Sequence, residues 1–359
     1  MLSASHKSPL GHIAAQLIVR LLRKIVPDQQ IDSYLKPWSE VDNSSWRSLL
    51  LGNGFSINIW DLFDYKSLYE VAKSAEVQSQ LDAQSIALFE KLNSNNFEDI
   101  LRVLFHARLV DEQLESPQVA SINALYSNTK NALAAAVNYS HVPFSISGLK
   151  LINHAFCNFS NIFTTNYDLI PYWAIMSENT SGFKDMFWGD ENTFDPSDTM
   201  VVAGACVISY LHGAIHLVEL PNGKTKKLTV NSQGSLSTLF DLAHPEYFPL
   251  FISEGTSEGK LSRIKRNDYL RFSFEKLQSI DGSLIVLGHS LHKDYDQHLL
   301  DALRHSELES IAIGVWPNQG PEQIILFKSR IQADLTNKKV YFFDSTTHPL
   351  GVPELKHVA

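Results

Sequence analysis

Cysteine is scarce in this chain: Cys157 and Cys206 are the two cysteines among 359 residues. Two thiols cannot form a four-thiolate zinc site, and they do not suggest the disulfide framework of a small secreted domain. No apolar run has the length of a membrane span, and the first residues do not follow the order of a secretory leader. We therefore expect a cytoplasmic protein that does not act at a membrane.

An excess of positive charge is also lacking. The chain has 30 lysine and arginine residues against 39 aspartate and glutamate residues, a formal net charge of −9. Because a nucleic-acid surface usually needs a clustered basic face, we expect no direct contact with nucleic acid. The 44% hydrophobic and 19% charged residues are typical of a globular protein with enough material for a sizeable core.

Short apolar segments alternate with helical patterns in the second half of the chain. After residue 245 the predicted strands are PLFIS, SLIVLG, SIAIGV and KVYFFD, with a helical pattern between each pair. This alternation predicts parallel βαβ units and an α/β fold with a Rossmann-like, doubly wound parallel sheet. Further strands are expected at 48–52, at 161–168 and over 207–230, where a Pro-Asn-Gly turn joins two of them.

Two regions have a purely helical pattern. One is 11–26, and the other runs from about 66 to 155, where apolar residues recur every three or four positions. We therefore expect a helical insertion after the first strand, packed on a core that is formed from both sides of it. The predicted units are an N-terminal helical segment (1–47), a core (48–65 and 156–345), the insertion (66–155) and a tail (346–359).

Glycine or polar residues follow four of the predicted strands. Open α/β sheets bind ligands beyond the carboxyl ends of their strands, so these positions are candidate site residues. They are Gly52–Ser56, Thr164–Asp168, His212-Gly213 and Gly288–Ser290.

Each position also has a simpler structural interpretation. Gly52 and Gly54 allow close approach of a ligand, and Ser56 could cap the following helix, yet the same residues suit a plain strand–turn–helix junction. Asn166 and Asp168 could form an Asx turn. An unperturbed histidine titrates near pH 6.5, which would suit His212 as a general base, but a structural histidine is the alternative.

Two other patterns do not predict sites. GTSEGKL (255–261) resembles a phosphate-binding P-loop but is one residue short, and Leu261 stands where a metal-binding hydroxyl belongs. His212 and His216 are four apart on a predicted strand, a spacing that spoils a shared metal geometry. The histidines and aspartates of GHSLHKDYDQH (288–298) match no ligand spacing, and we interpret them as solvated residues at a helix start. No metal site is predicted.

In order and residue type, the four strand ends resemble the sirtuin fold, specifically the bacterial sirtuin-like domains of anti-phage defence systems. Sirtuins carry Gly-Ala-Gly-x-Ser, Thr-Gln-Asn-x-Asp, His-Gly and Gly-x-Ser in this order. The corresponding segments here are Gly52-Asn53-Gly54-Phe55-Ser56, Thr164-Thr165-Asn166-Tyr167-Asp168, His212-Gly213 and Gly288-His289-Ser290. Asp64 begins a segment, DYK, that is similar to the sirtuin Asp-Phe-Arg loop.

Two departures from the sirtuin pattern argue against protein deacylation. Deacylase sirtuins hold a zinc ribbon on four cysteines after the His-Gly pair, whereas both cysteines of this chain precede His212. Thr165 stands where they carry glutamine. The defence-type relatives, which look like NAD glycohydrolases, tolerate both departures.

The resemblance implies an NAD+ glycohydrolase that releases nicotinamide and ADP-ribose, uses no metal and acts as an effector of abortive infection. It implies Asn166 and His212 as catalytic residues. It implies NAD contacts from Gly52, Asn53, Gly54, Phe55, Ser56, Asp64, Thr165, Asp168, Gly288, His289 and Ser290. The expected partners are further copies of the chain or a defence protein, such as an Argonaute, a helicase-type ATPase or a phage protein. The alternatives are a non-catalytic NAD or ADP-ribose sensor and a scaffold subunit.

Overall fold

The structure of the chain is a computed structural model. It describes residues 31–42, 46–60, 68–74, 76–77, 79–95, 97–140, 146, 148–178, 180–187, 190–197, 205–229, 248–252 and 256–357. The helix predicted over 11–26 lies outside the described residues, and so does Asp64.

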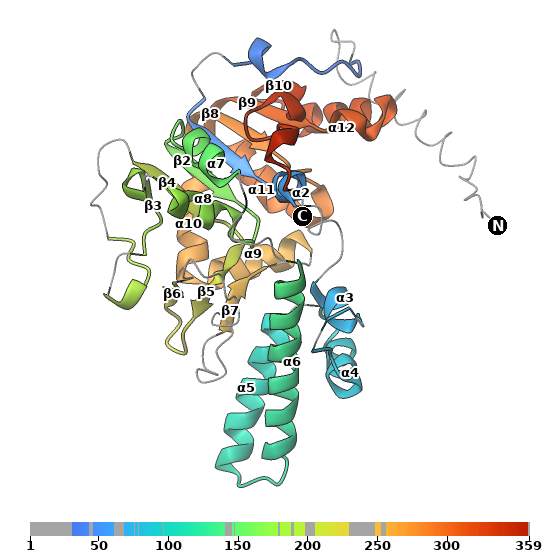
Figure 1. Ribbon diagram of the computed structural model, residues 1–359, viewed down its shortest axis with the longest axis vertical. Helices are drawn as coiled ribbons and strands as arrows, with labels where there is room; N and C mark the ends of the chain where they lie inside the picture. Colours follow the sequence, from blue (N-terminus) through green and yellow to red (C-terminus); the bar gives the residue numbers. More distant parts are fainter. Residues whose placement is uncertain are drawn as a thin grey trace, which may run out of the picture.

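Within the described residues, seven parallel strands form the central sheet, in the order β10-β9-β8-β1-β2-β4-β3 (Figure 1). The α/β fold with a parallel sheet that the alternating pattern predicts is therefore confirmed. Strand β1 is buried along its whole length, as an apolar central strand covered on both faces should be. The strands are β1 (Ser48–Leu51), β2 (Asn161–Thr164), β3 (Phe183–Lys184), β4 (Cys206–Tyr210), β8 (Asp281–Leu287), β9 (Glu307–Val315) and β10 (Lys339–Asp344).

Helices connect these strands and flank the sheet (Figure 1). They are α2 (Asn53–Ile59), α7 (Leu149–Phe156), α8 (Ile170–Ser177), α9 (Ser257–Arg266), α10 (Asp268–Gln278), α11 (Lys293–His305) and α12 (Pro321–Asp334). Short 3-10 helices lie at Trp38–Glu40, Thr180–Gly182, Asp190–Asn192, Pro317–Gln319, Ser345–Thr347 and Pro353–Leu355.

The helical pattern between PLFIS and SLIVLG forms two helices, α9 and α10. Asn267 lies between them in an extended conformation, and its side-chain oxygen accepts a hydrogen bond from the Leu270 amide. Asparagine favours this capping role, so the chain ends one helix and starts the next at that residue.

A second sheet is antiparallel and has three strands, in the order β6-β5-β7. They are β5 (Gly213–Glu219), β6 (Thr225–Lys227) and β7 (Phe248–Phe251). The segment PLFIS therefore does not join the parallel sheet, as its place in the alternation predicts, but pairs with β5. An aromatic contact accompanies this placement, because Tyr167 stacks on Phe251 with ring centroids 5.3 Å apart.

Among the described residues, four helices lie between α2 and α7: α3 (Leu68–Lys73), α4 (Ala83–Leu92), α5 (Phe97–Gln113) and α6 (Val119–Ser140). Helices α5 and α6 form a long hairpin that projects from the rest of the molecule (Figure 1). Ion pairs fix its base, from Arg102 to Glu219 of β5 and from Arg263 of α9 to Asp99. Among the described helices, none combines the length and the apolar character that crossing a membrane requires.

Candidate functional site

The last residues of four neighbouring strands lie in one row across the central sheet. Leu51 of β1 pairs with Thr164 of β2 on one side and with Leu287 of β8 on the other. Thr164 pairs in turn with Tyr210 of β4. The four strands therefore end level with one another, and the residues that follow them meet at one edge.

The predicted site segments begin within two residues of this row. Gly52 and Gly288 directly follow it, while Asn166 and His212 lie two residues beyond it. Strand β2, which follows β1 in this sheet along the chain, lies next to β1 on one side, and the later strand β8 lies next to β1 on the other side. The β1–β8 boundary is thus a topological switch point, where open α/β sheets place their ligands.

The two glycine turns at this boundary are in backbone contact. The Gly54 amide donates to the Gly288 carbonyl at 2.8 Å. Gly288 has a φ of +71°, and a Cβ atom there would lie 2.2 Å from the Phe55 nitrogen. Glycine is therefore required for the close approach of the two turns. The Gly54 amide is thus bonded within the protein, although the sirtuin resemblance implies that Gly54 contacts NAD.

Ser56, Asn166 and Asp168 form a buried hydrogen-bonded group, the Asn166 cluster. Asn166 Nδ2 donates to the Gly52 carbonyl at 3.0 Å and to Ser56 Oγ at 2.7 Å. Ser56 Oγ then donates to Asp168 Oδ2 at 2.5 Å. Because a backbone carbonyl can only accept, the side-chain nitrogen of Asn166 must face Gly52, which fixes the orientation of the amide.

That orientation leaves the Asn166 side-chain oxygen without a partner among the described residues. Asn166 is 5% exposed, so the unpaired oxygen is buried. Buried polar atoms are nearly always hydrogen-bonded, which makes this oxygen a candidate acceptor for a ligand.

Asp168 is an unusual carboxyl group in the same cluster. Burial raises its pKa from 3.8 to about 6, and the hydrogen bonds from Ser56 and the Ile170 amide oppose that rise. Ser56 lies inside α2, whose N-cap is Gly52, so the expectation that Ser56 caps this helix is wrong. It is fully buried and joins Asn166 to Asp168 instead.

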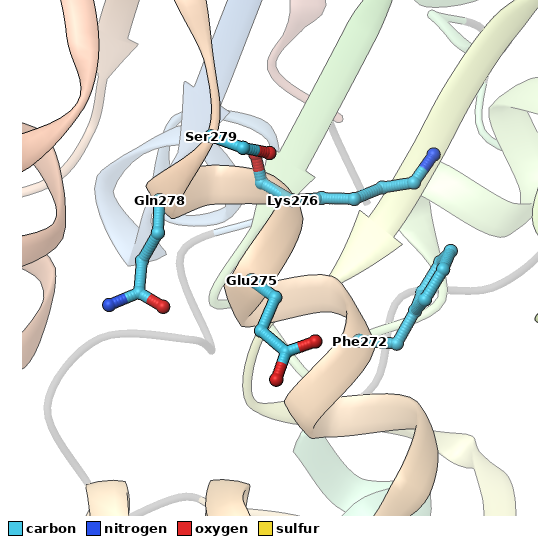
Figure 2. Close-up of a pocket in the computed structure, with 5 residues that line it drawn as sticks. All are labelled: Phe272, Glu275, Lys276, Gln278 and Ser279. Carbon is cyan, nitrogen blue, oxygen red and sulfur yellow. The ribbon is translucent and has the colours of Figure 1, made fainter.

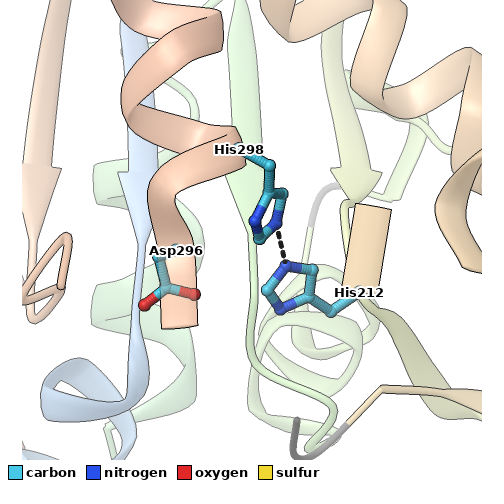
Figure 3. A group of neighbouring side chains, drawn as sticks. All are labelled: His212, Asp296 and His298. Atoms are coloured by element: carbon cyan, nitrogen blue, oxygen red, sulfur yellow. Dashed lines mark hydrogen bonds between the residues drawn. The ribbon is translucent and has the colours of Figure 1, made fainter. Parts of the chain in front are cut away.

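A second group, the His212 cluster, consists of His212, Ser257, Lys260, Asp296 and His298. The Nε2 atoms of the two histidines lie 3.0 Å apart (Figure 3). Ser257 Oγ lies 2.8 Å from His298 Nδ1 and also accepts from the His298 backbone amide at 2.8 Å. Lys260 Nζ donates to Asp296 at 3.1 Å. Helices α9 and α11 thus supply four of the five side chains.

Both histidines of the cluster are neutral at physiological pH. Burial lowers the pKa of His212 well below its ordinary value, and the positive charge of Lys260 adds to the effect. Burial also lowers the pKa of His298, to about 4, although the Asp296 carboxylate opposes it.

The interpretation of Asp296 and His298 as solvated residues at a helix start is wrong. They are 7% and 3% exposed, and both face the interior from α11. The local pattern contains a sign of this, because His298 lies four residues before the buried Ala302, on the same helix face. Ser257 and Lys260, which come from the rejected P-loop-like segment, could not be assigned from spacing.

The donor atoms of His212, Asp296 and His298 lie within 4.8 Å of one another, a set that can suit a divalent cation. The geometry does not fit one. The imidazole centroids are 5.3 Å apart and the nitrogens 3.0 Å, so the nitrogens point at each other, as in a direct hydrogen bond. Figure 3 shows the Asp296 carboxylate to one side of the imidazole pair, and Lys260 is its ion partner.

Other predicted ligand contacts are used within the protein. Thr165 donates its hydroxyl to the Leu51 carbonyl at 3.3 Å. Phe55 is buried in the core next to Phe156. Asn53 is exposed at the start of α2, at the edge where a ligand would lie.

The loop after β8 is held by a residue that the sequence pattern does not indicate. Arg330 of α12 donates to the carbonyls of Ser290 and Leu291. His289 Nδ1 accepts from the Leu291 amide, and burial lowers its pKa. The Ser290 side chain is exposed on the fixed loop.

Two cavities among the described residues do not include the predicted ligand contacts. A surface hollow of about 510 Å³ is lined by the end of α10, with Phe272, Glu275, Lys276, Gln278 and Ser279 spread around it (Figure 2). A cavity of about 450 Å³ lies between α9, α10 and α11 and reaches His298. Neither contains a predicted ligand contact, so the switch point remains the candidate site.

Comparison with protein families places the chain in one family. The model of the domain of unknown function DUF4917 matches residues 49–350, which is most of the chain, so the protein belongs to this family. The matched region runs from β1 to the end of the described core and includes both clusters. No curated protein matches the chain.

Proposed function

We propose that this member of the DUF4917 family is an NAD+ glycohydrolase, in which water cleaves the nicotinamide–ribose bond to give nicotinamide and ADP-ribose. The sirtuin-like order of motifs suggests the substrate. The observation that carries the proposal is the buried, unpaired side-chain oxygen of Asn166 at the switch point. With its nitrogen fixed by Gly52 and Ser56, the amide offers one oriented acceptor for a water or a ribose hydroxyl.

The reaction needs an oriented water and a base. The water oxygen bonds to the ribose carbon while the electrons of the breaking bond pass to the nicotinamide nitrogen, whose positive charge is neutralised. Asn166 orients the water, and His212 accepts the proton that the water loses. Burial lowers the pKa of His212, so the ring is neutral at neutral pH and has a lone pair for the proton, while the same shift weakens it as a base. A general base of this kind contributes roughly 10²- to 10⁴-fold.

The dinucleotide would lie across the β1–β8 boundary. The resemblance implies that Ser56 and Gly54 contact NAD, but both bond within the protein and so shape the site instead. The exposed Asn53 and Ser290 flank the boundary on its two sides and suit the phosphate and ribose groups. Asp168 lies beside Asn166, where it would accept from the nicotinamide carboxamide.

A non-catalytic NAD or ADP-ribose sensor is the second candidate. One observation favours the sensor. One of the two ring nitrogens of His212 is already engaged in the contact with His298. Calorimetry that detects NAD binding without release of nicotinamide would support the sensor.

An NADase that is always active would deplete its own cell, so the proposal includes gating by assembly or by a defence partner. The projecting hairpin offers a surface for it. Val103, Val110 and Leu114 lie on one side of α5 and its end, with exposed fractions of 43%, 57% and 70%. Apolar residues exposed at this spacing suit contact with another chain.

The test is incubation of the purified protein with NAD+, alone and with the product of a neighbouring gene, followed by identification of the products by mass. Nicotinamide and ADP-ribose are expected in equal amounts. If neither preparation consumes NAD+, the hydrolase proposal is wrong.

A further inference from the structure

The contact between His212 and His298 restricts which atom of His212 can act. The two Nε2 atoms are 3.0 Å apart, and the ring centroids are 5.3 Å apart, so the nitrogens point directly at each other. A separation of 3.0 Å is a direct hydrogen bond and leaves no room for a water between the rings. A substrate proton can therefore reach His212 only at Nδ1.

Because only Nδ1 can receive the proton, His212 must adopt one particular tautomer to act as a base. A neutral imidazole has one N–H and one lone pair. If Nδ1 is to accept a proton, Nε2 of His212 must carry the hydrogen and donate it to Nε2 of His298. His298 must then carry its own hydrogen on Nδ1.

Ser257 completes this arrangement. Its Oγ atom lies 2.8 Å from His298 Nδ1, and a hydroxyl oxygen has two lone pairs. One lone pair accepts from the His298 backbone amide at 2.8 Å, and the other can accept from His298 Nδ1–H. Both the backbone and the ring of His298 are thus fixed to the first residue of α9.

We propose that His298 is a positioning residue for His212: held by Ser257, it accepts the His212 Nε2–H and so keeps the His212 Nδ1 lone pair free for the substrate proton. The inference rests on the proposed hydrolase function and deepens it. When His212 takes up the proton, its bond to His298 becomes charge-assisted, and such bonds are roughly twice as strong as neutral ones.

The other ionisable groups near His212 and His298 are the remaining candidates for setting the His212 tautomer. The ionisable groups that act on the pair are Lys260 of α9, Asp296 and Asp301 of α11, and His289 of the loop after β8. Lys260 and Asp296 bond to each other, and His289 accepts from the Leu291 amide. Among the described residues, His298 is the recorded hydrogen-bond partner of the His212 ring.

Two substitutions of His298 separate positioning from packing. In His298→Gln the terminal amide reaches the place of Nε2, so its oxygen can still accept from His212 while the contact with Ser257 is lost. In His298→Asn the shorter amide reaches the place of Nδ1 and keeps the contact with Ser257 but not the one with His212. His305→Ala, at the exposed end of the same helix, is the matched control.

We expect His298→Asn to lose about 10- to 100-fold in kcat with little change in KM, as for other residues that orient a functional imidazole. His298→Gln should retain clearly more activity than His298→Asn, and His305→Ala should equal the wild type. If His298→Asn is as active as His298→Gln, or more active, in a wild type that consumes NAD+, the positioning role is overturned while the hydrolase function stands. A wild type that never consumes NAD+ overturns both.

A spectroscopic readout does not depend on turnover. Nitrogen NMR of histidine-labelled protein with ADP-ribose bound reports which ring nitrogen of His212 carries hydrogen, with the signal assigned through His212→Gln. We expect Nε2–H in the wild type and in His298→Gln, and a mixture of tautomers in His298→Asn. A His212 that carries its hydrogen on Nδ1 in the wild type contradicts the inference whatever the activity.

Discussion

The Asn166 cluster and the His212 cluster lie at the same edge of the central sheet, but they are built differently. Ser56, Asn166 and Asp168 all follow β1 or β2, two adjacent strands. The His212 cluster joins one strand end to side chains from two helices, α9 and α11, that start more than forty residues further along the chain. The first cluster therefore depends on strand register, and the second depends on how helices pack on the sheet.

The two clusters also differ in which hydrogen-bonding groups they leave without a partner. In the Asn166 cluster every donor is engaged and one buried acceptor is left over. In the His212 cluster the two rings share one contact, and the hydrogen between them can belong to either. The Asn166 cluster offers an acceptor of fixed orientation, whereas the His212 cluster offers a base whose tautomer depends on its neighbours.

The largest effect is expected from removing one functional side chain of each cluster. Asn166→Ala and His212→Ala should each lower NAD+ consumption by roughly 10²- to 10⁴-fold while the far-UV circular dichroism stays unchanged. Asn158→Ala and His305→Ala, at exposed positions, are the matched controls. Wild-type rates in both functional variants would show that neither cluster takes part in the reaction.

The glycine contact at the β1–β8 boundary should matter to the stability of the fold. Gly288→Ala places a Cβ against the Phe55 nitrogen at a φ of +71°, so overpacking adds to backbone strain, and we expect a loss of about 3 kcal/mol or more. Gly282→Ala, at the start of β8 with a φ of +67°, meets nothing within 4 Å and should cost about 1 kcal/mol. Urea unfolding measures both, and equal losses would contradict the packing argument.

Asp168→Asn should change the pH dependence of stability. The folded state raises the pKa of Asp168 from 3.8 to about 6, so between these values it holds a proton that the unfolded chain has released. Stability therefore falls as the pH rises through this window, by on the order of 3 kcal/mol in total. The variant lacks this loss, so its stability relative to the wild type should increase from pH 4 to pH 7. Parallel stability curves would contradict the buried-acid assignment.

His298 of the His212 cluster gives stability the opposite dependence on pH. The pKa of His298 is lowered to about 4 in the folded state, whereas the unfolded side chain binds its proton near pH 6.5. Stability therefore falls as the pH drops from about 6.5 to 4. Because the wild type and Asp168→Asn share this slope, it cancels when the two are compared.

The smallest effect is expected from a chelator. The donor atoms of His212, Asp296 and His298 bond to each other or to Lys260, so NAD+ consumption should be unchanged after dialysis against EDTA. Loss of activity with EDTA and recovery with a divalent cation would show that the histidine pair opens to bind a metal.

Sequence reasoning could reach the first cluster because its information is local. The strand ends can be recognised in the sequence because apolar runs stop at Gly52, Thr165 or Gly288. Parallel strands then bring these ends to one edge of the sheet. The orientation of Ser56 was missed, because whether a hydroxyl caps a helix or bonds inward depends on where that helix begins. His298 and Ser257 could not be paired from sequence, since only the packing of α9 against α11 brings them together.

The most direct test is NAD+ hydrolysis in water enriched in the heavy oxygen isotope, followed by mass analysis of the products. The mechanism predicts that the wild type releases nicotinamide together with ADP-ribose that carries one heavy oxygen at the ribose carbon, and that Asn166→Ala releases almost none. NAD+ that is bound but recovered intact, with no labelled ADP-ribose from any preparation, would contradict the hydrolase and support a sensor.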